Sequence, residues 1–486
     1  MKALALVDAL VVSEIPQLVF VREFATPKGV KGEKSPSQGN EQRRNTPNPG
    51  RRVLAETQEP KFGVLRLCST TPFLVFDSKY GFLALSAPVW TMAKMRDGAQ
   101  WLSNHYAAND YYCEGEHVVG SWAGKGAEIL GIAGQQIEPQ NEAFLRLFSG
   151  QTPKGEKLKP HTSEIIGYDF QCSAQKSVSI MARLGGDERL LEAHKQAVTE
   201  AYAKLESLAC VKEGTLGIDR QRVTTGVLCS ARFEHDTSRA LDPHIHTHFA
   251  TANFSITGQG KRYALETHDM VKAIRYAGKI YQSALRRNVE ELGYRTRDKF
   301  DQRGHLEGFD IDGISNELCE KYSQRRGEIE ERIAAFKAEH GREPTPAEIH
   351  VIAKETRTSK LTEISTEAVR AKQRERASAE ELAQIDRVRT QALNARKETA
   401  NIDTAELVSL VRDHLAERRA TFGAHDLIAE ALNRGMGKVR LSELESAIQA
   451  DPELVRLDQQ TSAMAILTDQ TNFRLCLLYT SDAADE

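Results

Sequence analysis

Four of the fourteen histidines fall in one short segment, F-E-H-D-T-S-R-A-L-D-P-H-I-H-T-H, which ends at His248. Alternate side chains of a β-strand point to the same face, so His244, His246 and His248 would share a face if this segment is extended. Imidazole is a common ligand of divalent metals, and His235 at the end of a preceding strand can complete a set of three with any two of the others. The spacing predicts a metal site and leaves its third member open.

A second cluster contains three tyrosines, Tyr106, Tyr111 and Tyr112, in N-H-Y-A-A-N-D-Y-Y-C. Clustered tyrosines commonly pack with their hydroxyls at the surface, whereas beside a metal a tyrosine can act as a nucleophile. Its pKa of about 10 makes the phenol weak unless a cation or a base favours the phenolate. A metal that polarises a phosphodiester stabilises charge on the non-bridging oxygens. The two clusters together indicate attack on a phosphodiester.

A third segment, G-Y-D-F-Q-C-S-A-Q-K-S-V-S, places Asp169 on an apolar strand before a helix. A carboxylate there needs a partner, and orienting a metal-bound imidazole is a common solution. Lys176, Ser177 and Ser179 offer contacts to phosphate. The alternative interpretation is an ordinary turn that caps the helix.

Basic residues gather further along the chain, where residues 261–300 hold ten Lys and Arg against five Asp and Glu. Lys272, Arg275 and Lys279 lie on a predicted helix there, with further arginines after them. This surface could follow a DNA strand, and a merely solvated helix face is an equal alternative.

Elements that would position these groups follow from hydrophobic periodicity. The predicted strands are Arg222–Phe233, His244–Ile256 and Arg262–Leu265, and the predicted helices are Asp187–Cys210, with Asp187 as its N-cap, and Thr267–Leu292. Thr345-Pro-Ala-Glu348 predicts a capping box, residues 360–400 a long solvated linker helix, and residues 404–451 a compact helical patch.

Composition limits the classes of protein to consider. The 486 residues are 40% hydrophobic and 27% charged, and they contain no apolar run near the ~20 residues of a membrane span, which excludes membrane insertion. Seven scattered cysteines without a C-x-x-C pair favour a reducing, cytoplasmic location. The formal net charge of −3 requires any nucleic-acid site to be a local basic surface.

The three motif segments, with S-W-A-G-K-G-A-E-I-L-G-I at residues 121–132, resemble one family, the MobF-class (TrwC/TraI) conjugative relaxases of the HUH endonuclease superfamily. The resemblance covers about residues 89–296. It implies an α+β fold, an antiparallel sheet with helices on one side and histidines at its centre, followed by an α-helical region. It also implies metal-dependent, site- and strand-specific cleavage and rejoining of single-stranded DNA at a plasmid origin of transfer, through a covalent 5′-phosphotyrosine.

The resemblance assigns roles by position in the motifs. His235, His246 and His248 match the metal ligands, Asp169 matches the acid that orients a ligand histidine, Tyr106 matches the first tyrosine pair, and Tyr111 and Tyr112 match the second. This chain departs from the pattern in three places. His105 replaces the first tyrosine of its pair, the spacer to Tyr111 is one residue short, and Gln175 stands where the family usually has proline.

Domain boundaries are predicted from these changes in composition. We expect a disordered or non-native extension over 1–88, the relaxase over 89–300, a charged helical linker over 301–403, the truncated start of a helicase-like region over 404–475, and an artefactual tail over 476–486. No G-x-x-x-x-G-K-[ST] loop occurs, so ATP-driven unwinding is not expected of these residues.

The implied cofactor is a divalent metal, Mg²⁺ ahead of Mn²⁺ or Zn²⁺. The implied partners are single-stranded origin-of-transfer DNA, accessory proteins of the relaxosome and a coupling protein. Three alternatives stay open: a rolling-circle replication initiator of the HUH type, a phosphoesterase with three histidines around its metal, and a non-catalytic DNA-binding fragment.

Overall fold

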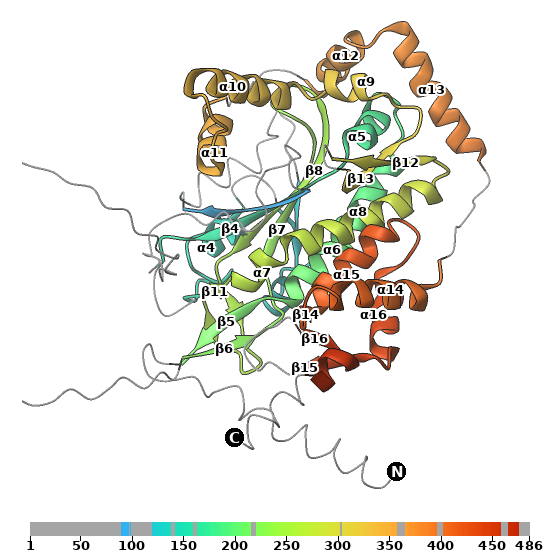
Figure 1. Ribbon diagram of the computed structural model, residues 1–486. Helices are drawn as coiled ribbons and strands as arrows, with labels where there is room; N and C mark the ends of the chain where they lie inside the picture. The colour runs from blue at the N-terminus through green and yellow to red at the C-terminus, as the bar shows by residue number, and fades with distance from the viewer. Residues whose placement is uncertain are drawn as a thin grey trace, which may run out of the picture. The chain divides into compact units, whose positions relative to one another are not determined.

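The computed structural model describes residues 89–96, 98, 119–137, 141–158, 163–214, 220–301, 304–356, 365–395, 402–457 and 465–475 (Figure 1). All of them belong to one compact unit, residues 72–486. The predicted extension over 1–88, the three tyrosines and the predicted tail over 476–486 lie outside the described residues. Among the described helices, none is long and apolar enough to cross a membrane.

A six-stranded antiparallel sheet forms the centre of the fold and confirms the expected fold class. Its order is β1-β4-β8-β7-β2-β3. Its strands are β1 (Trp90–Met95), β2 (Gly120–Ala123), β3 (Gln136–Ile137), β4 (Gly167–Ser173), β7 (Ser230–Thr237) and β8 (Pro243–Ala252). The histidine segment supplies β7 and β8, which pair in the middle of the sheet.

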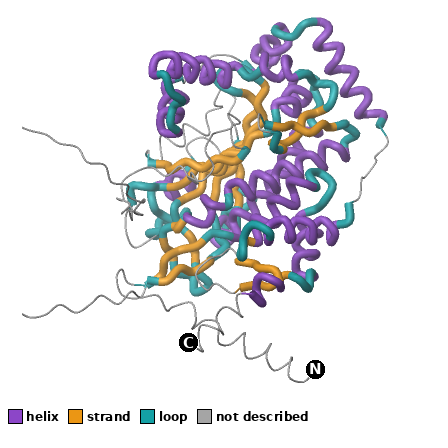
Figure 2. Tube along the Cα trace, in the orientation of Figure 1, coloured by secondary structure: helices purple, strands orange, loops and turns teal. Residues whose placement is uncertain are grey.

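Helices pack on one face of this sheet and bury the larger core. Phe249 of β8 stacks on Tyr202, with ring centroids 4.1 Å apart, and Phe170 of β4 joins the same cluster. The helices here are α5 (Lys176–Arg183), α6 (Arg189–Ser207), α7 (His268–Lys272) and α8 (Ile274–Glu291) (Figure 2). The opposite face carries a smaller core, in which Phe233 meets Phe144 at 6.1 Å. Its helices are the short α3 (Lys125–Ile129) and α4 (Glu142–Phe148).

Small sheets and a second group of helices complete the described chain. The strands are β5 (Cys210–Glu213), β6 (Gln221–Thr224), β9 (Ser255–Ile256), β10 (Arg262–Tyr263), β11 (Leu265–Glu266), β12 (Thr296–Phe300), β13 (Leu306–Ile311), β14 (Phe422–Gly423), β15 (Leu454–Leu457) and β16 (Ile466–Asp469). The helices are α9 (Asn316–Lys321), α10 (Gln324–His340), α11 (Pro346–Glu355), α12 (Thr366–Glu375), α13 (Ala379–Asn394), α14 (Thr404–Ala416), α15 (Ala424–Arg434) and α16 (Leu441–Ala450).

All three predicted strands are wrong in extent, and Arg262–Leu265 is divided between β10, which pairs with β9, and β11, which pairs with β5. The segment Arg222–Phe233 is divided between β6, which pairs with β5, and β7 of the central sheet. Gly226 lies between them with φ +61°, a left-handed conformation that ends an extended strand and that glycine adopts without strain. The segment His244–Ile256 is likewise β8 followed by the separate β9.

The predicted helices are correct in place and differ at their ends. The first begins at Arg189 rather than Asp187, whose carboxylate nevertheless accepts from the backbone N–H of Arg189 at 3.2 Å. The second is interrupted at Ala273, which separates α7 from α8. The capping box before α11 is present, because Thr345 N donates to the Glu348 carboxylate at 2.7 Å.

The expectation of one solvated helix over residues 360–400 is wrong. Ser378 forms a capping box that starts α13 as a separate helix after α12. Ile385, Val388 and Ala392 then lie in the larger core. Their spacing, i, i+3 and i+7, is the apolar stripe of an amphipathic helix, which the charged composition around it concealed.

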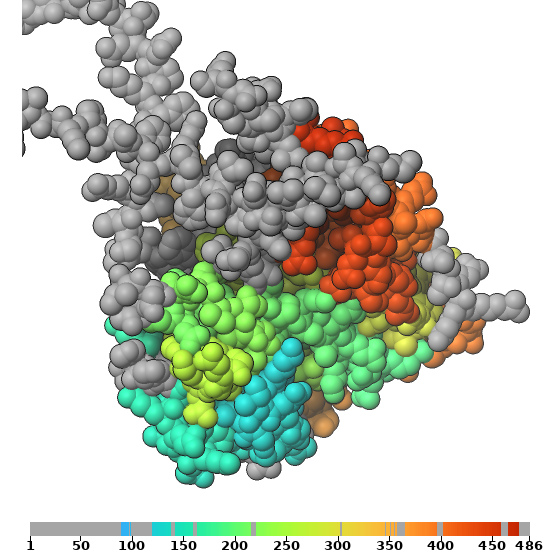
Figure 3. Space-filling model, turned by 90° about the horizontal axis from the view of Figure 1, so that it is seen from below, coloured from blue at the N-terminus to red at the C-terminus, as the bar shows by residue number. Residues whose placement is uncertain are grey.

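The C-terminal helical patch packs on α6 and α8. Gly437 N donates to Ser283 Oγ of α8 at 3.0 Å, and Lys204 of α6 pairs with Glu445 at 2.6 Å. Figure 3 shows the C-terminal elements (red) beside the green surface that includes α6. The predicted domain boundaries stay a prediction.

Candidate metal centre

Three histidines meet on the face of the sheet that carries the smaller core. His235 of β7 is paired directly with His246 of β8, and His248 follows on the same face. The ring centroids form a nearly equilateral triangle with sides of 5.1, 5.3 and 5.2 Å. One ring nitrogen of each residue lies within 4.8 Å of the others, and the side chains are only 3–8% exposed. Among the described residues, this is the one such group with metal-ligand geometry.

The alternation of β8 explains the placement of these side chains. Ile245 and Phe249 point into the larger core, while the intervening His246 and His248 point to the opposite face. Thr247 also faces the helices, where its hydroxyl bonds to His194. A one-residue slip of β8 would therefore bury the imidazoles among helices and remove the cluster.

Hydrogen bonds fix the orientation of two of the imidazoles. His248 Nδ1 lies 3.0 Å from both carboxylate oxygens of Asp169, and His246 Nδ1 lies 2.9 Å from the backbone oxygen of His244. These oxygens can only accept, so each Nδ1 carries the proton and donates it. The lone pair of each Nε2 is left for a metal, the arrangement that supports metal-bound histidines in general. The residues present therefore fit a divalent ion.

Burial keeps His246 neutral. It lowers the pKa of His246 well below the usual range, and the neighbouring His235 and His248 add to this effect. A neutral imidazole has the free lone pair that a metal needs, whereas a protonated imidazole has none. At neutral pH His246 can therefore bind a cation.

His244 lies beside the triad but outside it. Its ring centroid is 4.6 Å from that of His246, and its Nε2 is 3.4 Å from Ser173 Oγ. Burial lowers the pKa of His244 well below the usual range, with His246 as the next cause. The structure thus assembles His235 with His246 and His248, and not the three histidines of a single strand.

Sequence reasoning missed His194, which lies behind the triad on α6. Its Nε2 is 2.9 Å from Thr247 Oγ1 and its Nδ1 is 2.8 Å from Tyr281 OH. Burial, together with the Arg232 guanidinium, lowers the pKa of His194 to about 3. The signal was available, because His194 falls four residues after Leu190 and three before Ala197, within the apolar stripe of the helix.

Two of the proposed phosphate contacts are wrong. Ser177 and Ser179 are fully buried, where Ser177 donates to Asp310 at 2.6 Å and Ser179 accepts from Ile245 N at 3.1 Å. Both hydroxyls hold the helix against neighbouring strands. Lys176 donates to the Pro243 backbone oxygen at 2.9 Å, beside the start of β8, and burial lowers its pKa to about 8.

The predicted basic helix does not meet the triad. α8 packs on α6, whose residues contact the opposite face of the sheet. Arg275 is exposed there, and Lys279 donates to the Leu306 backbone oxygen at 3.2 Å while burial lowers its pKa to about 8. Lys272 is exposed on α7, immediately before α8.

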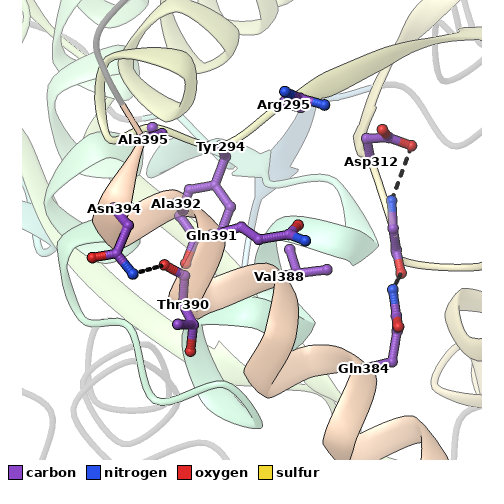
Figure 4. A pocket seen from close by; sticks show the side chains of 12 residues that line it. Tyr294, Arg295, Asp312, Gln384, Val388, Thr390, Gln391, Ala392, Asn394 and Ala395 are labelled. Atoms are coloured by element: carbon purple, nitrogen blue, oxygen red, sulfur yellow. Dashed lines mark hydrogen bonds between the residues drawn. The ribbon is translucent and has the colours of Figure 1, made fainter.

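A cavity of about 520 Å³ lies elsewhere, between α13 and the ends of β12 and β13 (Figure 4). Its polar lining includes Arg295, Asp312 and Gln384. No histidine or cysteine lines it, so it offers none of the donors that the triad provides.

Comparison with known protein families shows to which family this chain belongs. The TrwC relaxase family matches residues 95–380, more than half of the chain. The chain belongs to the TrwC relaxase family. The match includes the triad, Asp169 and the segment with the three tyrosines.

Individual members of the TrwC relaxase family agree with this assignment. A multifunctional conjugation protein TraI of Escherichia coli is 43% identical over 209 residues, and TraI of strain K12 is 38% identical over 211. Each alignment covers 40% of this chain and 11% of the relative, so the chain matches about a tenth of their length.

Solved relaxase structures share the fold. The conjugative relaxase TrwC in a copper-bound complex with oriT DNA is 29% identical, with a TM-score of 0.51, over 60% of this chain and 98% of that one. TrwC complexed with a 27-mer DNA that comprises the recognition hairpin and the cleavage site matches over the same shares, with the same identity and TM-score.

Proposed function

We propose that this chain is a conjugative relaxase, which cleaves and rejoins one strand of DNA at a plasmid origin of transfer. The observation that carries the proposal is the buried triad, in which one ring nitrogen of each imidazole lies within 4.8 Å of the others and two imidazoles are held by their Nδ1 atoms. Family membership supports the substrate class, because its TrwC neighbours are complexes with oriT DNA.

His235, His246 and His248 would hold one divalent ion, with Asp169 orienting His248. The bound ion supplies charge stabilisation on the non-bridging oxygens of the scissile phosphate. We propose Mg²⁺ as the working ion because metal availability, and not affinity alone, decides occupancy. Three imidazoles should nevertheless bind Mn²⁺ and Zn²⁺ more tightly than Mg²⁺, since Mg²⁺ prefers oxygen donors.

Tyr106 is the proposed nucleophile, from its position in the family motif. Its phenolic oxygen forms a bond to phosphorus as it loses its proton, and the bond from phosphorus to the 3′ oxygen breaks. That oxygen takes up a proton and leaves as a 3′ hydroxyl. The phosphodiester is exchanged and not hydrolysed, so the step is reversible and needs no ATP. Tyr111 or Tyr112 would then serve a second cleavage.

The remaining partners belong to the same proposal. Single-stranded DNA would approach the triad face, and Lys176 is the predicted phosphate contact whose charge acts on His244, the histidine beside the triad. Lys272, Arg275 and Lys279 could contact only DNA that continues around the molecule, because the helices α7 and α8 lie on the side of the larger core. Relaxosome accessory proteins, a coupling protein and a cytoplasmic location complete the proposed setting.

A covalent adduct tests the proposal. The protein is incubated with Mg²⁺ and an origin-of-transfer oligonucleotide labelled at its 3′ end, because the 3′ fragment carries the phosphate that joins tyrosine. A slow band on a denaturing gel, absent with a scrambled sequence, is the expected result. Hydrolysis without an adduct would favour a phosphoesterase, a cut that requires a replication origin would favour a rolling-circle initiator, and binding without cleavage would favour a DNA-binding fragment.

A further inference from the structure

The loop that joins β7 to β8 carries a strained backbone and a buried charge. Leu241 has φ +61°, a left-handed conformation that a leucine adopts only where its surroundings impose it. Asp242 follows and is 1% exposed. The pairing of β7 with β8 shifts register between His235 and Thr237, so the regular ladder ends before the loop begins. The sheet alone therefore does not determine this loop.

Residues far along the chain hold the Asp242 carboxylate. Gln324, the first residue of α10, donates its backbone N–H at 3.0 Å and its side-chain Nε2 at 2.9 Å. Arg376, directly after α12, donates from Nη1 at 2.8 Å. A buried carboxylate without such partners would be strongly destabilising. The ion pair with Arg376 and the two hydrogen bonds from Gln324 together fix the end of the loop.

Gln373 holds Leu241, the strained residue that precedes Asp242. Its Nε2 donates to the Leu241 backbone oxygen at 2.8 Å, and the Gln373 side chain is buried. The Gln373 backbone oxygen in turn accepts from Tyr322 OH at 2.5 Å. The Arg376 guanidinium lies 4.6 Å from the centre of the Tyr322 ring. We call Gln324, Gln373 and Arg376 the loop clamp.

The loop that the loop clamp holds is close to the metal ligands in sequence. His235 lies two residues before the end of β7, and His246 lies four residues after Asp242. Figure 1 shows α9, α10 and α12 together near the start of β8. Because His235 comes from one strand and its two partners from the other, the turn that joins these strands sets how the three imidazoles face one another.

We infer that the loop clamp positions the β7–β8 hairpin and thereby sets the affinity of the triad for its metal. Gln324, Gln373 and Arg376 are positioning residues, since none of them contacts the triad itself. The inference rests on the metal site of the proposed function. It also makes Gln324, Gln373 and Arg376, from the stretch predicted as a linker, positioning residues of the metal site.

Metal affinity in the full chain tests the loop clamp. Isothermal titration with Zn²⁺ or Mn²⁺ compares the unmodified chain with Arg376→Gln and Gln373→Leu. Residues that orient metal ligands typically contribute about 10–100-fold to affinity, and we expect a loss of about 10-fold in each variant. Lys372→Ala is the matched control, because Lys372 is exposed on the same helix, and its affinity should not change.

A double-mutant cycle separates positioning from general destabilisation. Asp242→Asn combined with Arg376→Gln should weaken metal binding no more than Asp242→Asn alone, because the first change already breaks the interaction that the second one removes. Arg376→Lys should recover part of the affinity. Unchanged metal affinity in both Arg376→Gln and Gln373→Leu, while the unmodified chain binds metal, would overturn the inference. Clamp-dependent metal binding in a chain that forms no DNA adduct would instead refute the proposed relaxase activity alone.

Discussion

The two faces of β8 use histidine in opposite ways. On one face, His246 and His248 donate through Nδ1, and one ring nitrogen of each lies within 4.8 Å of the other and of His235. On the other face, His194 of α6 has both ring nitrogens bonded, to Thr247 and to Tyr281. All three are buried, so burial does not distinguish them. A histidine becomes a candidate ligand when its ring nitrogen lies close to those of other histidines.

The largest expected loss of cleavage comes from removing the phenolic hydroxyl of Tyr106. Tyr106→Phe should abolish the DNA adduct, because the phenolic oxygen is the proposed nucleophile and His105 offers no second tyrosine. Metal binding should persist, since no ligand is lost. Mass spectrometry of the trapped peptide identifies the attacking residue. An adduct on Tyr111 or Tyr112 in the unmodified chain would transfer the role to that tyrosine.

Loss of a triad member should be nearly as severe. His246→Ala should abolish both cleavage and calorimetric uptake of Mn²⁺, because two imidazoles hold a divalent ion far more weakly than three. His244→Ala is the matched control on the same strand, and it should keep most metal affinity. The assignment fails if His244→Ala removes the metal while His235→Ala retains it.

Replacing Asp169, the carboxylate that accepts from His248, should lower metal affinity to an intermediate extent. Asp169→Asn replaces the acceptor for His248 Nδ1 by a weaker one and should lower metal affinity about 10–100-fold. The same titration measures it. Full affinity in Asp169→Asn would mean that the strand alone orients His248.

His194 should influence stability and not metal binding. The pKa of His194 is about 3 in the folded chain and about 6.5 in the unfolded chain. Between these two pH values His194 is protonated in the unfolded chain and neutral in the folded chain. Stability should therefore fall as pH drops from about 6.5 toward 3, by up to about 1.4 kcal/mol per pH unit. Chemical denaturation at several pH values measures this slope. His194→Gln should flatten it, and an unchanged slope would contradict the assignment.

The basic residues behind the sheet should have the smallest effect. Arg275→Ala and Lys272→Ala should barely change affinity for single-stranded DNA, because α7 and α8 pack on the side of the larger core. Lys176→Ala should weaken binding more and reduce the salt slope by about 0.7 if it contacts one phosphate. Fluorescence anisotropy against salt concentration measures both. Equal losses would show that DNA reaches both faces.

Local patterns predicted a metal site among these histidines and the family resemblance selected His235 as its third member, whereas contacts between distant residues could not be predicted. The alternation in H-I-H-T-H requires only that β8 be a strand, and Asp169 required only an apolar strand with one carboxylate. The loop clamp could not be found in this way, because Asp242 meets Gln324 and Arg376 at separations of 82 and 134 residues. The buried stripe of α13 was hidden by its charged neighbours, although Ile385, Val388 and Ala392 show its spacing. The division of the predicted strand at Gly226 could not be predicted, because it depends on which strands β6 and β7 pair with in the folded chain.

The long separation between Asp242 and Arg376 has a consequence for synthesis. A chain made from its N-terminus has all three ligand histidines long before it has Arg376. Until that arginine emerges, the Asp242 carboxylate lacks its cationic partner, and water is the better environment for it. We therefore expect the loop between β7 and β8 to reach its final conformation only after Arg376 has left the ribosome.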